Sequence, residues 1–350
     1  MPLPFAPSCA PLLLGSLPYL EAALALKMSR RYAGELLTWP QLWQRDMREQ
    51  FLAQGAAGFP GLVIDEAGGN VFVDTTQAMA QFDRFELGYL ENHTALAQLG
   101  ERDAAGLAEL LRLESLHGVR ALKGQTLGPI SLAMQLTDQQ QRPLIYDVAL
   151  FEAVGQFVRM RVAWQQQCLA ELGLPVILCL DEPFLEMIGS PFLPIDWEDA
   201  QMQIRLALAD VDGCRAVFAS GGVDWGHLLR LGVDLVIGDV YTYSAAMLGA
   251  AETLAEFVAA GGMVGLGVVP ADDEALVGTT AAQLVGQVET LLDRLEQAGV
   301  ERLQLLRQAV ITPNGALGLL SPTVAERALH LLADVSAQLR ETYNLVPQSA

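Results

Sequence analysis

The stretch Pro175-Val-Ile-Leu-Cys-Leu180 is a continuous apolar run, and Val233-Asp-Leu-Val-Ile237 is nearly so. Strands of a parallel sheet that is covered on both faces have this character, because neither face meets water. Further short apolar runs recur along the chain and alternate with longer amphipathic stretches. Such alternation is typical of βαβ units and predicts an α/β fold built on a parallel sheet.

Eight predicted strands with intervening helices indicate a (β/α)8 barrel, the TIM-barrel architecture. The strands are Leu12–Ser16, Leu62–Asp65, Ala121–Gly124, Val176–Asp181, Arg215–Ala219, Leu235–Asp239, Met263–Val268 and Val310–Thr312. The predicted helices include Tyr146–Leu172, Asp199–Leu208, Thr279–Ala298 and Ser321–Arg340. The last begins with an N-cap serine followed by a proline, which is a common start of a helix.

Residues 66–120 interrupt the alternation, since they are long and polar, with a helical pattern over residues 97–117. We expect them to form an insertion between the second and third strands. No charged low-complexity run or Gly/Ser linker divides the 350 residues. The sequence therefore predicts a single barrel domain over residues 1–350, with one helical insertion.

The chain is acidic, with 41 acidic against 21 basic side chains and a formal net charge of −20. Such a field repels phosphate backbones and anionic lipid headgroups, which disfavours nucleic acids and membrane surfaces as partners. No stretch approaches about 20 apolar residues, and no basic segment precedes the first apolar run, so we expect a cytoplasmic protein. The four cysteines are too scattered for a disulfide framework.

Polar residues lie where several predicted strands end, and a barrel of this kind holds its active site there. Glycine beside such residues lets a ligand approach backbone N–H groups, which can hold a carboxylate, while an aspartate can hold an ammonium group. We therefore predict a small, amino-acid-like ligand. The predicted substrate-binding residues are Gly15, Ser16, Lys123, Asp181 and Glu182. Aromatic candidates for the pocket wall are Trp39, Trp43, Phe59, Tyr89, Trp225, Tyr241 and Tyr243.

Several of these strings resemble the C-terminal catalytic domain of cobalamin-independent methionine synthase, which belongs with uroporphyrinogen decarboxylase in one superfamily of barrels. They are Gly15-Ser-Leu-Pro18, Lys123-Gly-Gln-Thr-Leu-Gly-Pro-Ile130, Leu180-Asp-Glu-Pro183 and Ile311-Thr-Pro-Asn-Gly-Ala-Leu-Gly318, together with Trp39–Leu42 and Gly58–Gly61. The resemblance implies a methyltransferase that moves a methyl group from a folate or corrinoid donor to a thiol. A corrinoid protein is then a conceivable partner.

The same resemblance implies a zinc site, because the family activates its thiol by binding the sulfur to zinc. Three of the four ligand positions depart from the family: Phe218 replaces a histidine, Ser220 a cysteine and Gly315 another cysteine. Asp239 alone keeps the ligand type. Since a tight zinc site needs about three or four N, S or O donors, we predict no zinc here, with Asp239 as a candidate general acid or base.

Three functions fit these residues. The first is a divergent methyltransferase-like enzyme that keeps its small-molecule pocket but not the zinc site. The second is a non-catalytic barrel that binds a small molecule. The third is a lyase like uroporphyrinogen decarboxylase, but the arginine-rich N-terminal motif of that family is missing, and the nearest basic cluster is Arg30-Arg31. We predict the first and leave open whether catalysis is retained.

Overall fold

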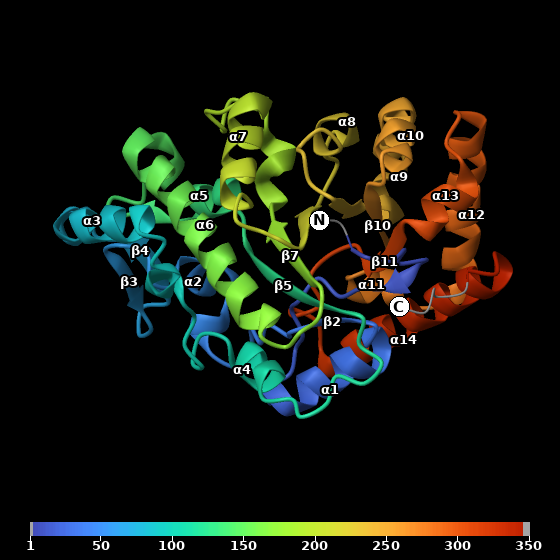
Figure 1. Cartoon of the computed structure of the whole chain (residues 1–350), viewed down its shortest axis with the longest axis horizontal. Coiled ribbons are helices and arrows are strands. Elements are labelled where there is room, and N and C mark those ends of the chain that lie inside the picture. Colours follow the sequence, from blue (N-terminus) through green and yellow to red (C-terminus); the bar gives the residue numbers. More distant parts are fainter. Residues whose placement is uncertain (1–2, 346–350) are drawn as a thin grey trace.

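A computed structural model describes residues 3–345, and within them eight parallel strands form a nearly closed (β/α)8 barrel (Figure 1). The predicted fold class is confirmed. In barrel order the strands are β1 (Ala10–Pro11), β11 (Ala309–Pro313), β10 (Met263–Val269), β9 (Leu235–Asp239), β8 (Cys214–Ala219), β7 (Val176–Asp181), β5 (Ala121–Leu127) and β2 (Leu36–Thr38). A parallel bridge between Leu12 and Leu36 joins the two ends of this order.

Two apolar clusters build the core, one on each face of the sheet. The inner cluster fills the barrel with alternate strand residues such as Ile177 and Cys179, because successive side chains of a strand point to opposite faces. The outer cluster lies between the sheet and the helices. Those helices are α1 (Ala22–Ala33), α6 (Val148–Ala170), α7 (Trp197–Ala207), α8 (Trp225–Leu228), α9 (Val240–Gly249), α10 (Ala251–Ala259), α12 (Ala281–Gln297), α13 (Arg302–Arg307) and α14 (Pro322–Thr342).

The second barrel strand was wrongly predicted. Leu62–Asp65 is β3, which pairs antiparallel with β4 (Asn70–Val73) in a separate three-stranded sheet completed by β6 (Thr137–Asp138). Leu36–Thr38 is the strand that pairs with β5 inside the barrel. A three-residue strand is too short to produce a recognisable apolar pattern, whereas a half-buried hairpin strand such as Leu62–Asp65 can. The first strand was misplaced as well, since β1 covers Ala10–Pro11 and ends before the predicted Leu12–Ser16, where only isolated bridges occur.

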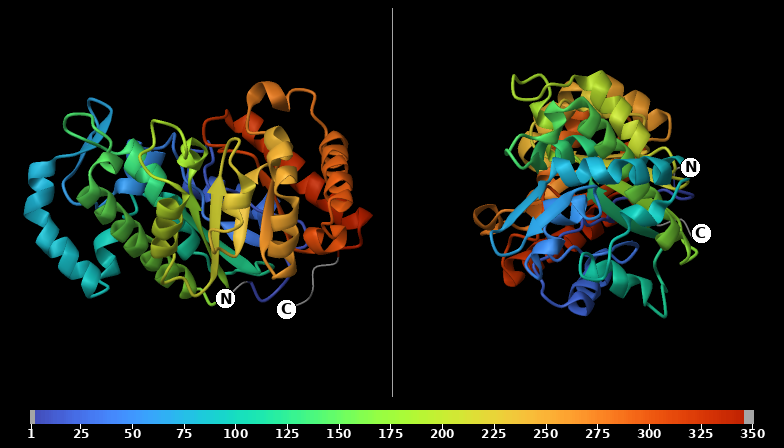
Figure 2. Two further views of the ribbon diagram at one scale, coloured as in Figure 1. Left: turned by 90° about the horizontal axis from the view of Figure 1, so that it is seen from above. Right: turned by 90° about the vertical axis from the view of Figure 1, so that its left-hand side faces the viewer.

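The excursion between β2 and β5 carries the β3–β4 hairpin of the small sheet and several helices, whereas β6 follows β5 in the chain (Figure 2). Its longest helix, α3 (Thr75–Leu90), lies at one end of the long axis of the molecule, and α12 and α14 lie toward the other. Asp74 caps α3 by accepting hydrogen bonds from the N–H groups of Thr76 and Gln77. The helical pattern expected over residues 97–117 is confined to α4 (Ala105–Leu111), because Asp103 makes a turn with Gly100 just before it.

Predicted helices on the rest of the barrel agree with the structure to within about two residues. The side chain of Ser321 caps α14 as expected, and Pro322 is the first helical residue. Further helices are α2 (Phe51–Ala56), α5 (Pro129–Gln135) and α11 (Asp273–Leu276), with single 3-10 turns at Met47–Glu49, Thr94–Ala97, Leu144–Tyr146 and Pro183–Met187. None of the helices within residues 3–345 has the length and apolar character needed to cross a membrane.

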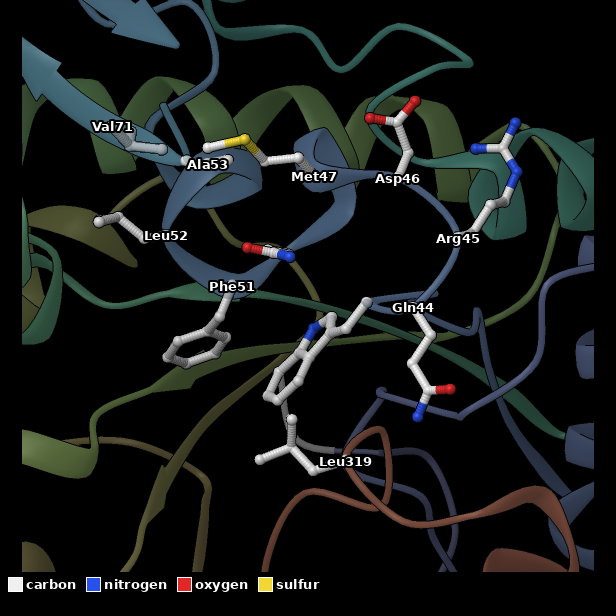
Figure 3. Close-up of a pocket in the computed structure, with 12 residues that line it drawn as sticks. Gln44, Arg45, Asp46, Met47, Phe51, Leu52, Ala53, Val71 and Leu319 are labelled. Carbon is white, nitrogen blue, oxygen red and sulfur yellow. The ribbon is translucent and has the colours of Figure 1, made fainter. Parts of the chain in front are cut away.

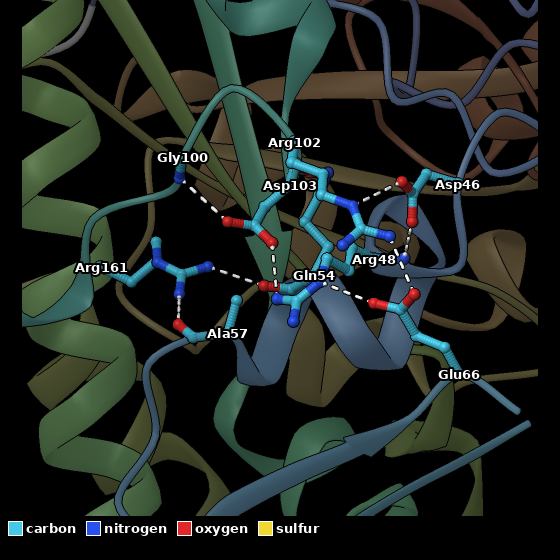
Figure 4. Close-up of polar contacts among 9 residues, drawn as sticks. All are labelled: Asp46, Arg48, Gln54, Ala57, Glu66, Gly100, Arg102, Asp103 and Arg161. Carbon is cyan, nitrogen blue, oxygen red and sulfur yellow. Dashed lines mark hydrogen bonds and ion pairs between the residues drawn. The ribbon is translucent and has the colours of Figure 1, made fainter.

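A buried arginine ties the excursion to the barrel (Figure 4). The guanidinium of Arg161, on α6, donates hydrogen bonds to the backbone carbonyls of Ala97, Ala57 and Gln54, the last at 2.9 Å. Arg161 is 1% exposed, and burial lowers the pKa of its guanidinium to about 9, against the opposing charge of Asp103. It therefore stays charged at neutral pH. Its three acceptors are backbone carbonyls at the end of α2 and at the end of the Thr94–Ala97 turn.

Candidate active site at the carboxyl ends of the strands

A cavity of about 160 Å3 opens where the barrel strands end. Its walls come from the segments that follow β1, β2, β7, β8 and β11, which are far apart in sequence. This volume exceeds that of one water site and suits a small organic molecule. The lining residues are Leu14, Ser16, Gln41, Trp43, Phe51, Asp181, Pro183, Phe218, Ser220, Gly315 and Ala316.

The cavity brings together five residues singled out from the sequence. Ser16 and Asp181, which were predicted to bind substrate, line it, and so do Phe218, Ser220 and Gly315, the positions at which the sequence departs from the ligands of the family it resembles. The other four predicted residues, Gly15, Lys123, Glu182 and Asp239, are not part of the lining. Asp181, which we expect to bind an ammonium group, thus lies in the same cavity as the three positions at which the sequence departs from the family's ligands.

Asp181 ends β7 and presents a buried carboxyl group to the cavity. Its hydrogen-bond contact within residues 3–345 comes from Sγ of Cys179, 3.8 Å from Oδ1, and thiols are weak donors. Burial raises the pKa of Asp181 from its ordinary 3.8 to about 7, although the charge of Lys123 and the contact with Cys179 oppose this. A carboxyl group that is partly protonated near neutral pH can bind a cation in its ionised form or act as an acid or base.

Lys123 lies deeper in the barrel than Asp181. It pairs in register with Ile177, four residues before Asp181, and its side chain is fully buried. Nζ donates hydrogen bonds to the Leu14 carbonyl at 2.7 Å and to Oε1 of Gln125 at 3.2 Å. This ammonium therefore supports the cavity floor electrostatically without lining it.

Gly15 serves close packing rather than the cavity wall. Its φ of +145° is unfavourable for residues with a side chain. A Cβ at this position would lie 2.7 Å from Oε1 of Gln41 and 2.9 Å from the amide of Gln125. Glycine here lets the two glutamine side chains approach the backbone beside Ser16.

Glu182 points away from the cavity, because neighbours on a strand face opposite sides and Asp181 faces inward. Its carboxylate accepts hydrogen bonds from the N–H groups of Ile130 and Ser131, at 3.0 and 2.8 Å, at the start of α5. Burial raises the pKa of Glu182 to about 7, while these hydrogen bonds lower it. The contacts make Glu182 a cap of α5.

Replacing Glu182 by glutamine should destabilise the fold. One amide N–H2 would then face a backbone N–H of α5, leaving a buried donor without its acceptor, which costs about 1–3 kcal/mol. We expect the urea midpoint at pH 8 to fall accordingly. Glu186→Gln, at an exposed position nearby, is the matched control and should leave the midpoint unchanged. Equal midpoints for both variants would contradict the capping role.

Asp239 caps a helix beside the cavity. Its Oδ1 accepts from the Thr242 N–H at 2.8 Å, and its Oδ2 accepts from Nδ2 of Asn314 at 3.2 Å. The bond to Asn314 joins the segments after β9 and β11, which carry two of the family's ligand positions. Within residues 3–345, no three His, Cys, Asp or Glu side chains are placed to hold a metal ion. The donor set therefore does not fit zinc.

Three lining residues come from the segment after β2, namely Gln41, Trp43 and Phe51. Trp43 was an aromatic candidate, whereas Gln41 and Phe51 were not predicted. Gln41 and Phe51 were missed because the second strand was predicted at Leu62–Asp65. Residues 39–53 were therefore expected before that strand, whereas in the structure they follow β2, at the end of the barrel that carries the site. The Trp39–Leu42 string, which carries part of the family resemblance and contains Gln41, was the signal available.

A second, larger cavity of about 660 Å3 adjoins the first (Figure 3). We call the two cavities the inner cavity and the outer chamber. The outer chamber is lined by Trp43, Gln44, Arg45, Asp46, Met47, Gln50, Phe51, Leu52, Ala53, Gly69, Val71 and Leu319. Most of these residues belong to the segment after β2, with the β3–β4 hairpin and the segment after β11 contributing the rest.

Comparison with known proteins reveals a shared fold. No protein-family model matches the sequence, and no curated protein matches it either. The structure is similar to a methyltransferase from Methanosarcina mazei, with a TM-score of 0.60 and 13% identity, over 98% of this chain and 95% of that one. A beta-mannanase from Alicyclobacillus acidocaldarius covers 67% of this chain at 12% identity, with 78% of its own length and a TM-score of 0.38. The methyltransferase thus shares this barrel along nearly its whole length.

Proposed function

We propose that this chain is a divergent, methionine synthase-like methyltransferase that binds a small amino-acid-like molecule in the inner cavity and works without a zinc-bound thiolate. The observation that carries the proposal is the buried carboxyl group of Asp181, which faces a largely apolar cavity at the carboxyl ends of the barrel strands. The fold shared with a methyltransferase supports the reaction class. Fold alone does not establish activity, so the site residues carry the argument.

The polar groups of the inner cavity suit the two ends of an amino acid. Asp181 offers an acceptor for an ammonium group, and the charge-assisted hydrogen bond between the two is stronger than a neutral one. Oγ of Ser16 accepts a hydrogen bond from the Gly318 N–H at 3.2 Å, so its own hydroxyl hydrogen can be donated to a ligand carboxylate. Ser220 adds a second hydroxyl to the wall.

The methyl acceptor follows from the donor set at the altered zinc positions. Phenylalanine, serine and glycine at 218, 220 and 315 supply no ligand that would turn a thiol into a zinc thiolate. We therefore extend the proposal to an acceptor that needs no such activation, with a folate or a corrinoid as methyl donor. The donor assignment rests on the family resemblance.

Binding and turnover are tested separately. Norleucine serves as the amino-acid probe and hexanoate as its matched control without the amine, each titrated calorimetrically into the full chain. If norleucine binds and hexanoate does not, the result supports the site. If neither probe binds, the result overturns it. Transfer of a labelled methyl group from methyltetrahydrofolate or methylcobalamin to any amino-acid probe supports the enzyme. Ligand binding with no transfer from either donor favours the non-catalytic barrel instead.

Affinity for the amine probe should rise with pH. The ammonium binds the ionised form of Asp181, whose pKa in the free protein is raised to about 7. Below that pH the proton must first leave, so affinity falls by up to about tenfold per pH unit, or roughly 50-fold between pH 7 and pH 5. Titrations of norleucine at pH 5, 6, 7 and 8 measure this. A pH-independent affinity would contradict contact with Asp181.

A further inference from the structure

The inner cavity and the outer chamber share part of their walls. Trp43 and Phe51 line both, and their rings lie 5.4 Å apart between centroids at an interplanar angle of 56°. Both residues come from the segment after β2. These two rings are packed against each other and form a wall that both cavities share, so a ligand held by Asp181 lies next to the outer chamber and can extend along this wall toward it.

The outer chamber has a largely apolar wall, and each charged side chain in that wall is paired with another residue of the protein. Its apolar side chains include Met47, Leu52, Val71 and Leu319. The two charged lining residues have partners, since Arg45 forms an ion pair with Glu49 and Asp46 accepts a hydrogen bond from Arg102 at 2.9 Å. No uncompensated charge is thus available for an ionic ligand group, which leaves burial of apolar surface as the main attraction.

Two features of this chamber lack a partner in the protein itself. Nε1 of Trp43 is buried and has no hydrogen-bond acceptor within residues 3–345. Leu319 stands 78% exposed at the chamber wall. A buried N–H without an acceptor is costly, so an acceptor placed beside Trp43 would be favoured, and Leu319 adds apolar surface to the chamber wall.

We infer that the outer chamber binds the apolar or aromatic side chain of the same ligand whose amino-acid head lies in the inner cavity. This inference rests on the proposed function of the inner cavity. It names the ligand class as α-amino acids, or close analogues, with a long unbranched or aromatic side chain. Trp43 then acts as a specificity residue, with its rings as a wall for the side chain and its N–H as a donor to any acceptor placed there.

A homologous series of probes tests the inference on the full chain. Alanine, 2-aminobutyrate, norvaline, norleucine and 2-aminoheptanoate differ by one methylene each, and calorimetry or thermal unfolding at millimolar concentrations measures their affinities. Each methylene buried in the chamber should raise affinity roughly three- to fourfold. Affinity that stays flat or falls beyond 2-aminobutyrate would overturn the outer chamber as a subsite.

Variants separate this inference from the proposed function. Leu319→Asp should weaken norleucine binding at least tenfold and leave alanine binding unchanged, whereas Leu90→Asp, at an exposed leucine elsewhere, should change neither. Trp43→Phe keeps a smaller aromatic wall and removes the N–H, so it should retain the chain-length dependence. Binding of alanine with no gain along the series overturns only this inference, whereas failure of every probe overturns the proposed function with it.

Discussion

Replacing Asp181 by asparagine should weaken binding of the amine probe by about 100-fold or more at pH 8 and also abolish its pH dependence. The amide cannot carry the negative charge that pairs with the ammonium, charge-assisted hydrogen bonds are about twice as strong as neutral ones, and a buried ammonium left without its counter-charge is strongly disfavoured. Hexanoate has no amine and is not expected to bind the native protein, so the substitution should not change its measured heat of titration. Retained affinity for norleucine in the variant would remove Asp181 from the site.

The same substitution should stabilise the ligand-free protein above neutral pH. Burial raises the folded-state pKa of Asp181 to about 7, against an ordinary value of 3.8 in the unfolded chain. Between these two values the folded protein keeps a proton that the unfolded chain has lost, so the native protein loses stability as pH rises. The loss is about 1.4 kcal/mol per pH unit, or roughly 4 kcal/mol at pH 8, and Asp181→Asn avoids it.

Urea unfolding of both proteins from pH 4 to pH 8 measures this effect. The advantage of the asparagine variant should be absent near pH 4, grow up to pH 7 and then level off. Asp83→Asn, at an exposed position on α3, is the matched control and should show no such growth. A variant that is less stable than the native protein at every pH would instead give Asp181 a structural role.

Arg161→Met should lower the free energy of unfolding by roughly 3–5 kcal/mol. The substitution keeps roughly the length of the side chain but removes every donor, so the carbonyls of Ala57 and Ala97 lose their partner, while that of Gln54 keeps only the Ala57 N–H. Each buried acceptor without a partner costs about 1–3 kcal/mol, although part of the cost of burying the guanidinium is recovered.

Arg159→Met on the same helix is the control for this prediction. Arg159 forms a partly exposed ion pair with Asp210, and such pairs contribute about 0–1 kcal/mol. Denaturant unfolding of the two variants at pH 7 should therefore separate clearly. Equal destabilisation would show that the carbonyl contacts of Arg161 contribute no more than a surface pair.

Arg161→Met should also weaken ligand binding, although Arg161 is not part of the cavity lining. Arg161 fixes the backbone of Gln54, and the side-chain amide of Gln54 accepts a hydrogen bond from Nε2 of Gln41 at 2.6 Å. Gln41 lines the inner cavity. Loss of the arginine should thus loosen one wall of the site, and calorimetry with norleucine measures the result.

Prediction from sequence succeeded for strands that are long and covered on both faces. β7 and β9 end where the apolar runs predicted, at Asp181 and Asp239, because burial on both sides requires uninterrupted apolar residues. β2 escaped notice because Leu36–Thr38 is too short to form a pattern. For the same reason, Gln41 and Phe51, which line the inner cavity in the segment after β2, were not predicted.

The sequence by itself determined that this chain forms an eight-stranded parallel barrel, and it located Asp181 at the carboxyl end of a strand, whereas Ser16 lies in the segment that follows β1. Those properties follow from local apolar runs and from the chain order of polar residues. Only the tertiary structure decided which polar side chains share the cavity. Glu182 turns outward to cap α5, and Asp239 pairs with Asn314, because strand alternation and contacts between distant segments fix each side chain's direction.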